Sequence, residues 1–253
     1  MSGPQPWDGH IHWTLKSAFD SHDEEVEALH QQPLYAPYGN RIPRFSLGLF
    51  QHGLRYIPYD ADEDAYRTVA LMRLPLNIDL KTLFKAIRGG MVFSAHLMNM
   101  KRVAGFHMGV VIFVHQNDAL GFVEYGNKHG ISFDGRPAKV ILYGTATYPM
   151  STDLSRKIFE KGHTRCVSIK GAPDRGRYSA VATYIQLHLP MYFALGDRMV
   201  ENAEATELVI RFNSVQAAGA ALETLRVFPR LAECEFGFAP DPCAEPLPGS
   251  EDQ

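Results

Sequence analysis

Two blocks of the chain, residues 67–143 and 164–239, repeat one order of predicted secondary structure. Each block alternates short apolar runs, rich in β-branched residues, with amphipathic stretches that have helical spacing. The order is strand-helix-strand-strand-helix-strand, which is typical of a split β-α-β sandwich with two helices on one face of an antiparallel sheet. The repeat therefore predicts an α+β protein with two ferredoxin-like sandwiches in tandem.

The first block has the clearer pattern. The apolar run Val69–Leu74 predicts a strand, and Pro75 ends it. Asp79 can cap the helix that follows, because apolar residues then recur at helical spacing until Gly89 and Gly90. The other elements predicted here are strands over Val92–Asn99, Met108–Val114 and Ala138–Tyr143, a basic turn at Lys101-Arg102, and a helix over Asp118–Lys128.

The second block is a divergent copy. Its most regular segments are the alternating run Glu207–Phe212 and the alanine-rich helix that Ser214 can cap. The remaining predicted elements are strands over Arg165–Ile169, Met199–Glu201 and Cys234–Phe238 and a helix over Tyr178–His188.

The segments outside the blocks differ from them in composition and charge. Residues 1–66 are rich in proline and aromatic residues and are predicted to be mostly irregular, residues 144–163 form a linker, and residues 240–253 are predicted to be a disordered acidic tail. The formal net charge of −3 conceals an uneven distribution, with −6 over 1–66, +6 over 67–143 and −4 over 240–253. A basic module between acidic ends indicates a polyanion partner, internal masking of the basic charge, or both.

Several stretches of the first block resemble the RNA recognition motif (RRM) family. These are the central strands VALMRL and FHMGVVIF, the Leu74-Pro75 step before the helix, and the approach Ile131–Arg136 to the last strand. The resemblance covers 67–143 well and 164–239 less well. It implies a four-stranded sheet whose open face stacks RNA bases on aromatic rings in its first and third strands.

The chain departs from the family at those stacking positions. In the first block they hold Ala70, Met108 and Val110, and the position that is usually asparagine holds Arg73. The matching positions of the second block hold Ser168, Glu207 and Val209. Because each stacked base contributes roughly 1–3 kcal/mol, we expect RNA contact that is mainly electrostatic and low in sequence specificity.

Basic residues around the first sheet offer the electrostatic route to single-stranded RNA. The candidate RNA-binding residues are Arg73, His96, Lys101, Arg102, Met108, Val110, Arg136 and Lys139. A second basic group, on the first helix, has an ordinary solvated face as its simpler explanation and comprises Lys81, Lys85 and Arg88.

The alternative function is a protein-interaction module that has lost RNA binding. Period-2 alternation predicts that the open face of the first sheet is apolar without being aromatic, a composition typical of a surface that is packed internally or binds a protein. The leader, the second domain or a partner could cover it. The candidate interface residues are Ala70, Met72, Met98, Met108, Val110, Ile112 and Ile141.

The sequence does not predict catalysis, metal binding or cofactor binding. Three cysteines without C-x-x-C spacing indicate a reducing compartment and no zinc site, and no catalytic constellation or cofactor motif is recognised. The string Asp8–His12 resembles a metal-binding start of amidohydrolase barrels, but no apolar strand precedes it. We expect a non-enzymatic intracellular protein, nuclear or cytoplasmic, with no metal, cofactor or membrane segment.

Overall fold

The computed structural model describes residues 14–17, 52–55, 58, 64–171, 176–188, 195–202 and 207–248. The chain divides into two compact units, residues 1–62 and 63–253. In the first unit, β1 (Thr14–Ser17) pairs antiparallel with β2 (His52–Arg55). The rest of the predicted leader, including the string Asp8–His12, lies outside the described residues.

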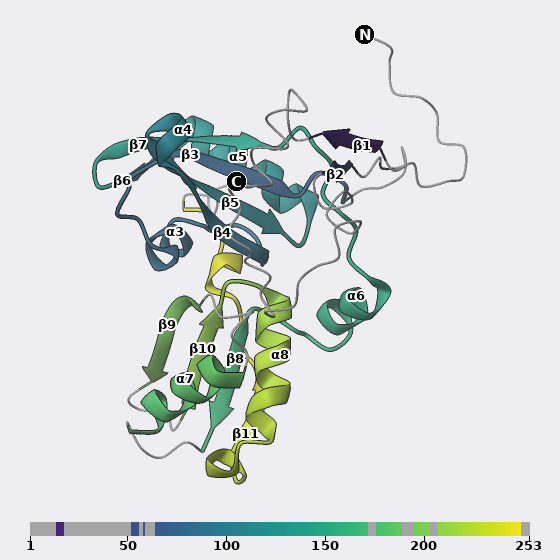
Figure 1. Cartoon of the computed structure of the whole chain (residues 1–253), viewed down its shortest axis with the longest axis vertical. Coiled ribbons are helices and arrows are strands. Elements are labelled where there is room, and N and C mark those ends of the chain that lie inside the picture. The colour runs from purple at the N-terminus through teal and green to yellow at the C-terminus, as the bar shows by residue number, and fades with distance from the viewer. Residues whose placement is uncertain are drawn as a thin grey trace, which may run out of the picture. The chain divides into compact units, whose positions relative to one another are not determined.

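The first domain of the second unit is a five-stranded antiparallel sheet in the order β4-β5-β3-β7-β6 (Figure 1). Its elements are β3 (Thr68–Leu74), α3 (Leu80–Lys85), β4 (Val92–Met100), α4 (Lys101–Ala104), β5 (Phe106–Phe113), α5 (Gln116–His129), β6 (Ile131–Phe133) and β7 (Arg136–Leu142). The predicted strands and both predicted helices are present. The basic turn is instead the short helix α4, and β6 adds a hairpin strand.

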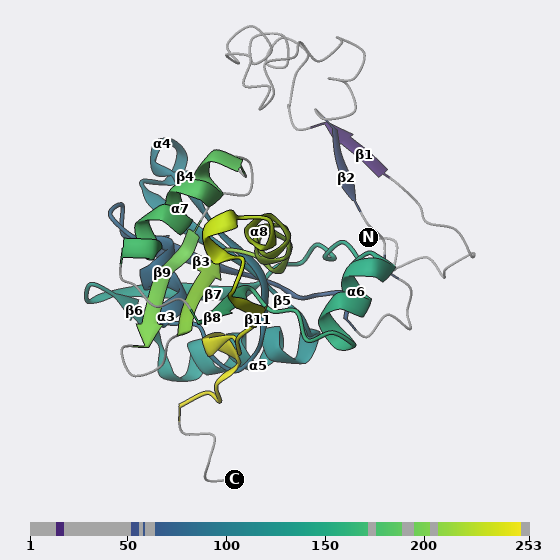
Figure 2. The same ribbon diagram turned by 90° about the horizontal axis from the view of Figure 1, so that it is seen from below.

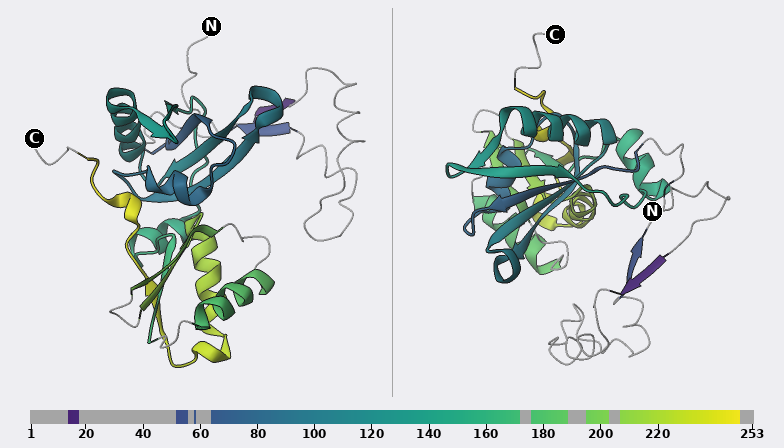
Figure 3. Two further views of the ribbon diagram at one scale, coloured as in Figure 1. Left: turned by 90° about the vertical axis from the view of Figure 1, so that its left-hand side faces the viewer. Right: turned by 90° about the horizontal axis from the view of Figure 1, so that it is seen from above.

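The second domain repeats this arrangement with four strands in the order β11-β8-β10-β9. Its elements are β8 (Cys166–Lys170), α7 (Gly176–His188), β9 (Leu195–Asn202), β10 (Glu207–Phe212), α8 (Val215–Arg226) and β11 (Glu235–Phe238). Figure 2 shows α7 beside α8, and the left view of Figure 3 shows both on one side of the sheet. The predicted fold class, two α+β sandwiches in tandem, is confirmed.

Local sequence signals explain where the helices begin and which side of each strand is buried. The Asp79 carboxylate accepts a hydrogen bond from the Thr82 amide at 2.7 Å, and the Ser214 hydroxyl accepts one from the Ala217 amide at 3.1 Å. Alternate strand residues form the core under the first sheet, as the period of 2 predicts. The central ones are Val69, Leu71, Val111, Phe113 and Val140.

A buried arginine occupies the same position in both domains. Arg67 precedes β3 and donates to the Phe113 carbonyl at 3.1 Å, and Arg165 precedes β8 and donates to the Phe212 carbonyl at 3.2 Å. Both carbonyls end the third strand of their own sheet, and both arginines are at most 2% exposed. This shared contact is an internal repeat that the apolar pattern of the sequence does not reveal.

The segment predicted as a linker contains the helix α6 (Thr152–Phe159), capped by Ser151. Leu154 and Ile158 pack in one apolar cluster with Val114 from the first domain and Val215 from the second. No helix was predicted here, because a short apolar stripe over two helical turns is a weak sequence signal.

The prediction of a disordered tail from residue 240 is wrong for the residues that the structure describes. Asp241 and Cys243 are 3% and 0% exposed, and a 3-10 turn runs over Pro242–Ala244. The Asp241 carboxylate accepts from the Val92 amide at 3.1 Å and the Glu245 carbonyl accepts from the Gly89 amide at 2.7 Å. The tail composition is typical of disorder, but pairing with the first domain satisfies its polar groups.

No helix in the described part of the chain is both long enough and apolar enough to cross a membrane.

The three cysteines differ in burial, which predicts different reactivity. Burial raises the pKa of the Cys166 and Cys243 thiols to about 12, whereas Cys234 is only half-buried. Because the thiolate is the reactive form, we expect Cys234 to react with a disulfide reagent at pH 8 more than about tenfold faster than the other two.

Thiol titration of the folded protein, with Cys234→Ser as the control, measures this difference. All three thiols should react rapidly after unfolding in guanidinium. Rapid reaction of either remaining thiol in folded Cys234→Ser would contradict the buried placement of Cys166 and Cys243.

Candidate nucleic-acid interface

The sheet of the first domain places the predicted open-face residues side by side. Ile141 pairs with Ala70, Ala70 with Val110, and Val110 with His96, so these four form one row across the strands. A neighbouring row contains Met72 opposite Lys139 and Met98 opposite Met108. Ile112 pairs with Thr68 on one side and Ser94 on the other.

The centre of this face is buried. Ala70 is 0% exposed and Met108 and Val110 are each 7% exposed, with Met72 and Ile141 packed against them. These central side chains therefore offer little contact area to a base or to a protein. Met98, at 39% exposed, lies at the margin.

Five predicted cationic residues gather at one end of this sheet, which we call the basic end. Strands β3 and β4 both run antiparallel to β5, so they finish at the same end, where β7 begins. All five residues are exposed, and no ion pair joins any of them to a carboxylate in the described part of the chain. The basic end comprises Arg73, Lys101, Arg102, Arg136 and Lys139.

Local backbone features orient two of these segments. Arg73 has a φ of 65°, in the left-handed region, at a register shift between β3 and β5 that lets both Leu71 and Leu74 enter the core. The Asn99 side chain accepts from the Lys101 amide at 3.1 Å where α4 begins. The sequence indicated neither the bulge nor the helical turn.

His96 supplies the one ring among the predicted RNA-binding residues. Loss of surrounding water lowers the pKa of its imidazole, so the ring is neutral at pH 7. It pairs across the strands with Val110 on the open face. A neutral imidazole offers a base a stacking surface and adds no phosphate-binding charge.

The basic group Lys81, Lys85 and Arg88 does not join the basic end, because α3 and the residues that follow it lie on the core side of the sheet. Lys81 and Lys85 are exposed there. Arg88 forms an ion pair with Glu245 at 3.1 Å and donates to the Ile87 carbonyl at 2.7 Å.

The second domain has no rings at the positions that match the stacking residues. Ser168 is buried and donates a hydrogen bond to the Glu207 carboxylate, and Val209 pairs with Ser168 in the sheet. In addition, α3 of the first domain contacts the edge strand β9. This sheet is therefore a weaker candidate platform than the first.

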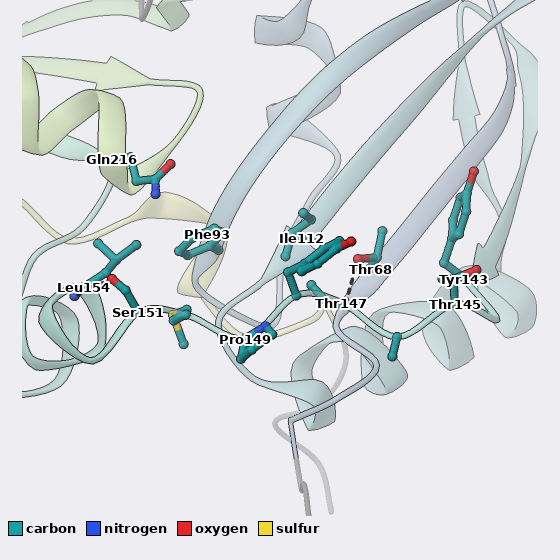
Figure 4. A pocket seen from close by; sticks show the side chains of 13 residues that line it. Thr68, Phe93, Ile112, Tyr143, Thr145, Thr147, Pro149, Ser151, Leu154 and Gln216 are labelled. Carbon is teal, nitrogen blue, oxygen red and sulfur yellow. Dashed lines mark hydrogen bonds between the residues drawn. The ribbon is translucent and has the colours of Figure 1, made fainter. Parts of the chain in front are cut away.

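A pocket that the sequence pattern does not reveal lies at the end of the first sheet opposite the basic end. It has a volume of about 580 Å³ and is bordered by strand ends, the residues after β7, α6 and α8. Figure 4 shows Tyr143 at one side, Thr68 and Ile112 in the middle, and Phe93 and Gln216 at the other side. Two tyrosines line this pocket: Tyr143 ends the strand predicted over Ala138–Tyr143, and Tyr148 follows it. The sequence pattern marks neither as a pocket residue.

The described residues contain no group of three or more histidine, cysteine or acidic side chains that could hold a metal ion. The histidines of the string Asp8–His12 lie outside the described residues.

No protein-family model matches the sequence, and no curated protein matches it. Among solved structures, RNA recognition domains 1 and 2 of Sex-lethal from Drosophila melanogaster share 17% identity with a TM-score of 0.24, covering 68% of this chain and 99% of that chain. The first two RRM domains of a yeast poly(U)-binding protein share 12% identity with a TM-score of 0.27, covering 69% and 99%.

Three N-terminal RNA-binding domains of a yeast splicing factor also share 12% identity, with a TM-score of 0.25, and cover 88% of this chain and 79% of that chain. These similar structures are of RNA-binding proteins that contain several such domains.

Proposed function

We propose that this chain binds single-stranded RNA through the basic end of its first domain, with contacts that are mainly electrostatic and low in sequence specificity. The observation that carries the proposal is the convergence of five exposed cations from three separate segments at one end of a sheet. Cations that lack a protein carboxylate remain available to phosphates, and phosphate contacts carry no direct sequence information.

The shape of the basic end favours a single strand over a duplex. The helix at the basic end, α4, has four residues, too few to lie along a groove. The buried positions of Met108 and Val110 favour low specificity, because base reading on the sheet requires exposed rings or polar groups.

Binding of a mixed-sequence RNA oligonucleotide should weaken steeply with salt. Five phosphate contacts predict a slope of about −3.5 in a plot of log affinity against log salt, or roughly a 100-fold loss between about 50 and 200 mM. The variant Lys101→Ala/Arg102→Ala should lower the slope to about −2, because two contacts are lost. Fluorescence anisotropy with the full chain measures both slopes.

The matched control is Lys81→Ala/Lys85→Ala, which removes the same charge from the core side of the sheet and should keep the original slope. The proposal would be contradicted by an absence of RNA binding at about 50 mM salt, or by equal slopes for the two double variants.

A further inference from the structure

The pocket at the far end of the first sheet has a chemistry that the basic end lacks. Two partly exposed tyrosines border it, Tyr143 at 37% and Tyr148 at 47% exposed, together with the side chain of Phe93. Thr145 and Gln216 add a hydroxyl and an amide to its lining. Aromatic rings beside a few hydrogen-bonding groups are the surroundings that proteins use to hold an unstacked nucleobase.

The segment that carries the tyrosines is held to the start of β3 by a series of hydrogen bonds. The Tyr143 amide donates to the Thr68 carbonyl at 2.8 Å, and the Thr147 amide donates to the Ala65 carbonyl at 2.7 Å. The Thr68 and Thr147 hydroxyls lie 2.8 Å apart (Figure 4). Because the backbone beside the pocket is already ordered, a ligand pays little entropy to organise it.

Arg67 also holds the tyrosine segment in place, through hydrogen bonds to backbone carbonyls. Its buried guanidinium donates to the Tyr148 carbonyl at 3.0 Å and to the Phe113 carbonyl at 3.1 Å, so one side chain joins the tyrosine segment to the end of β5. Arg67 also lies over the Phe93 ring, with 5.7 Å between its Cζ and the ring centroid. Arg67 is therefore a positioning residue for the pocket.

We propose that this pocket holds one nucleobase of a bound single-stranded RNA against the rings of Tyr143 and Tyr148. The inference rests on the proposed RNA-binding function and names the base site that its electrostatic contacts lack. The volume of about 580 Å³ lies within the usual range for small-ligand pockets. About 17 Å, the length of five strand residues, separates Thr68 at the pocket from Arg73, and one strand of RNA is long enough to reach both sites.

Uncharged nucleosides test the pocket independently of the phosphate contacts. Adenosine and uridine are added at millimolar concentration to the full chain, and binding is followed by ligand-observed NMR. We expect binding to the unmodified chain that is insensitive to salt, is unchanged in Lys101→Ala/Arg102→Ala, and weakens at least about fivefold in Tyr143→Leu and in Tyr148→Leu.

Tyr143→Phe and Tyr148→Phe keep the rings and should bind nucleosides within about twofold of the unmodified chain, which separates stacking from loss of fold. Tyr125→Leu, on α5 at the other face of the sheet, is the matched control and should have no effect. The proposal that this pocket binds a base would be overturned if nucleosides do not bind, or if the leucine variants bind them as tightly as the unmodified chain. Either result would count even if the RNA affinity keeps its dependence on salt. If nucleosides bind but RNA affinity does not depend on salt, the base-binding pocket is supported and the proposed electrostatic RNA binding at the basic end is overturned.

Discussion

Replacing Asp241 by alanine is expected to lower the free energy of unfolding by about 3–5 kcal/mol, because it leaves the Arg165 guanidinium buried without a counter-charge. The two side chains are 0–1% exposed and form two contacts, from Nη2 to Oδ1 at 2.8 Å and from Nε to Oδ2 at 3.0 Å. The guanidinium also lies 3.8 Å from the centroid of the Phe84 ring in the first domain. Urea unfolding of the full chain measures the loss.

Glu245→Ala is the matched control, since it breaks an exposed ion pair with Arg88 in the same tail and should cost less than about 1 kcal/mol. The double variant Arg165→Met/Asp241→Leu should recover part of the stability lost in Asp241→Ala, because it removes both buried charges together but leaves the Val92 amide and the Phe212 carbonyl without these partners. Equal losses for Asp241→Ala and Glu245→Ala would show that the buried pair does not hold the tail to the two domains.

Reversing two charges at the basic end is expected to have the largest effect on RNA affinity. A unit charge about 4 Å from a phosphate contributes roughly 1 kcal/mol in water, and reversal replaces this attraction with an equal repulsion. Lys101→Glu/Arg102→Glu should therefore lower affinity at low salt by about 4 kcal/mol, roughly 1000-fold. Anisotropy titration at low salt measures it.

The control variant Lys81→Glu/Lys85→Glu changes the net charge by the same amount, but on the helical side of the sheet. It separates the effect of charge at the basic end from the effect of total charge. We expect a loss of less than about tenfold for this control, because Lys81 and Lys85 lie on the helical side of the sheet and do not contact a strand bound at the basic end. Similar losses for both variants would mean that total charge, and not the basic end, governs binding.

The fold was largely predictable because the sequence signals that specify its helices and strands involve residues close together in the chain. A few neighbouring residues specify each element and its buried side. The helix α3 is marked by its cap at Asp79 and by the apolar side that Leu83 and Phe84 share, and β3 by the alternation of Val69 and Leu71. The order of the elements then restricts the chain to two split β-α-β sandwiches. The helix α6 was missed since it is short and its apolar partners lie in both domains.

The candidate site was only partly predictable. The sequence identified the cations of the basic end one by one, and the sheet register brought Arg73 together with Arg136, which lies far along the chain. The face between the two ends was predicted to be apolar and either packed internally or bound to a protein, and the structure shows that Ala70, Met108 and Val110 are buried. Their burial depends on side chains from adjacent strands, which a single strand does not specify.

By itself, the sequence determined that this protein is a tandem of two α+β sandwiches with a basic first module and no stacking rings at the expected positions. The tertiary structure alone decided that the acidic tail packs between the domains and that Tyr143 and Tyr148 border a pocket. The physical reason is that periodicity and capping act over a few residues, whereas a buried ion pair or a pocket joins side chains from distant segments and leaves no local pattern.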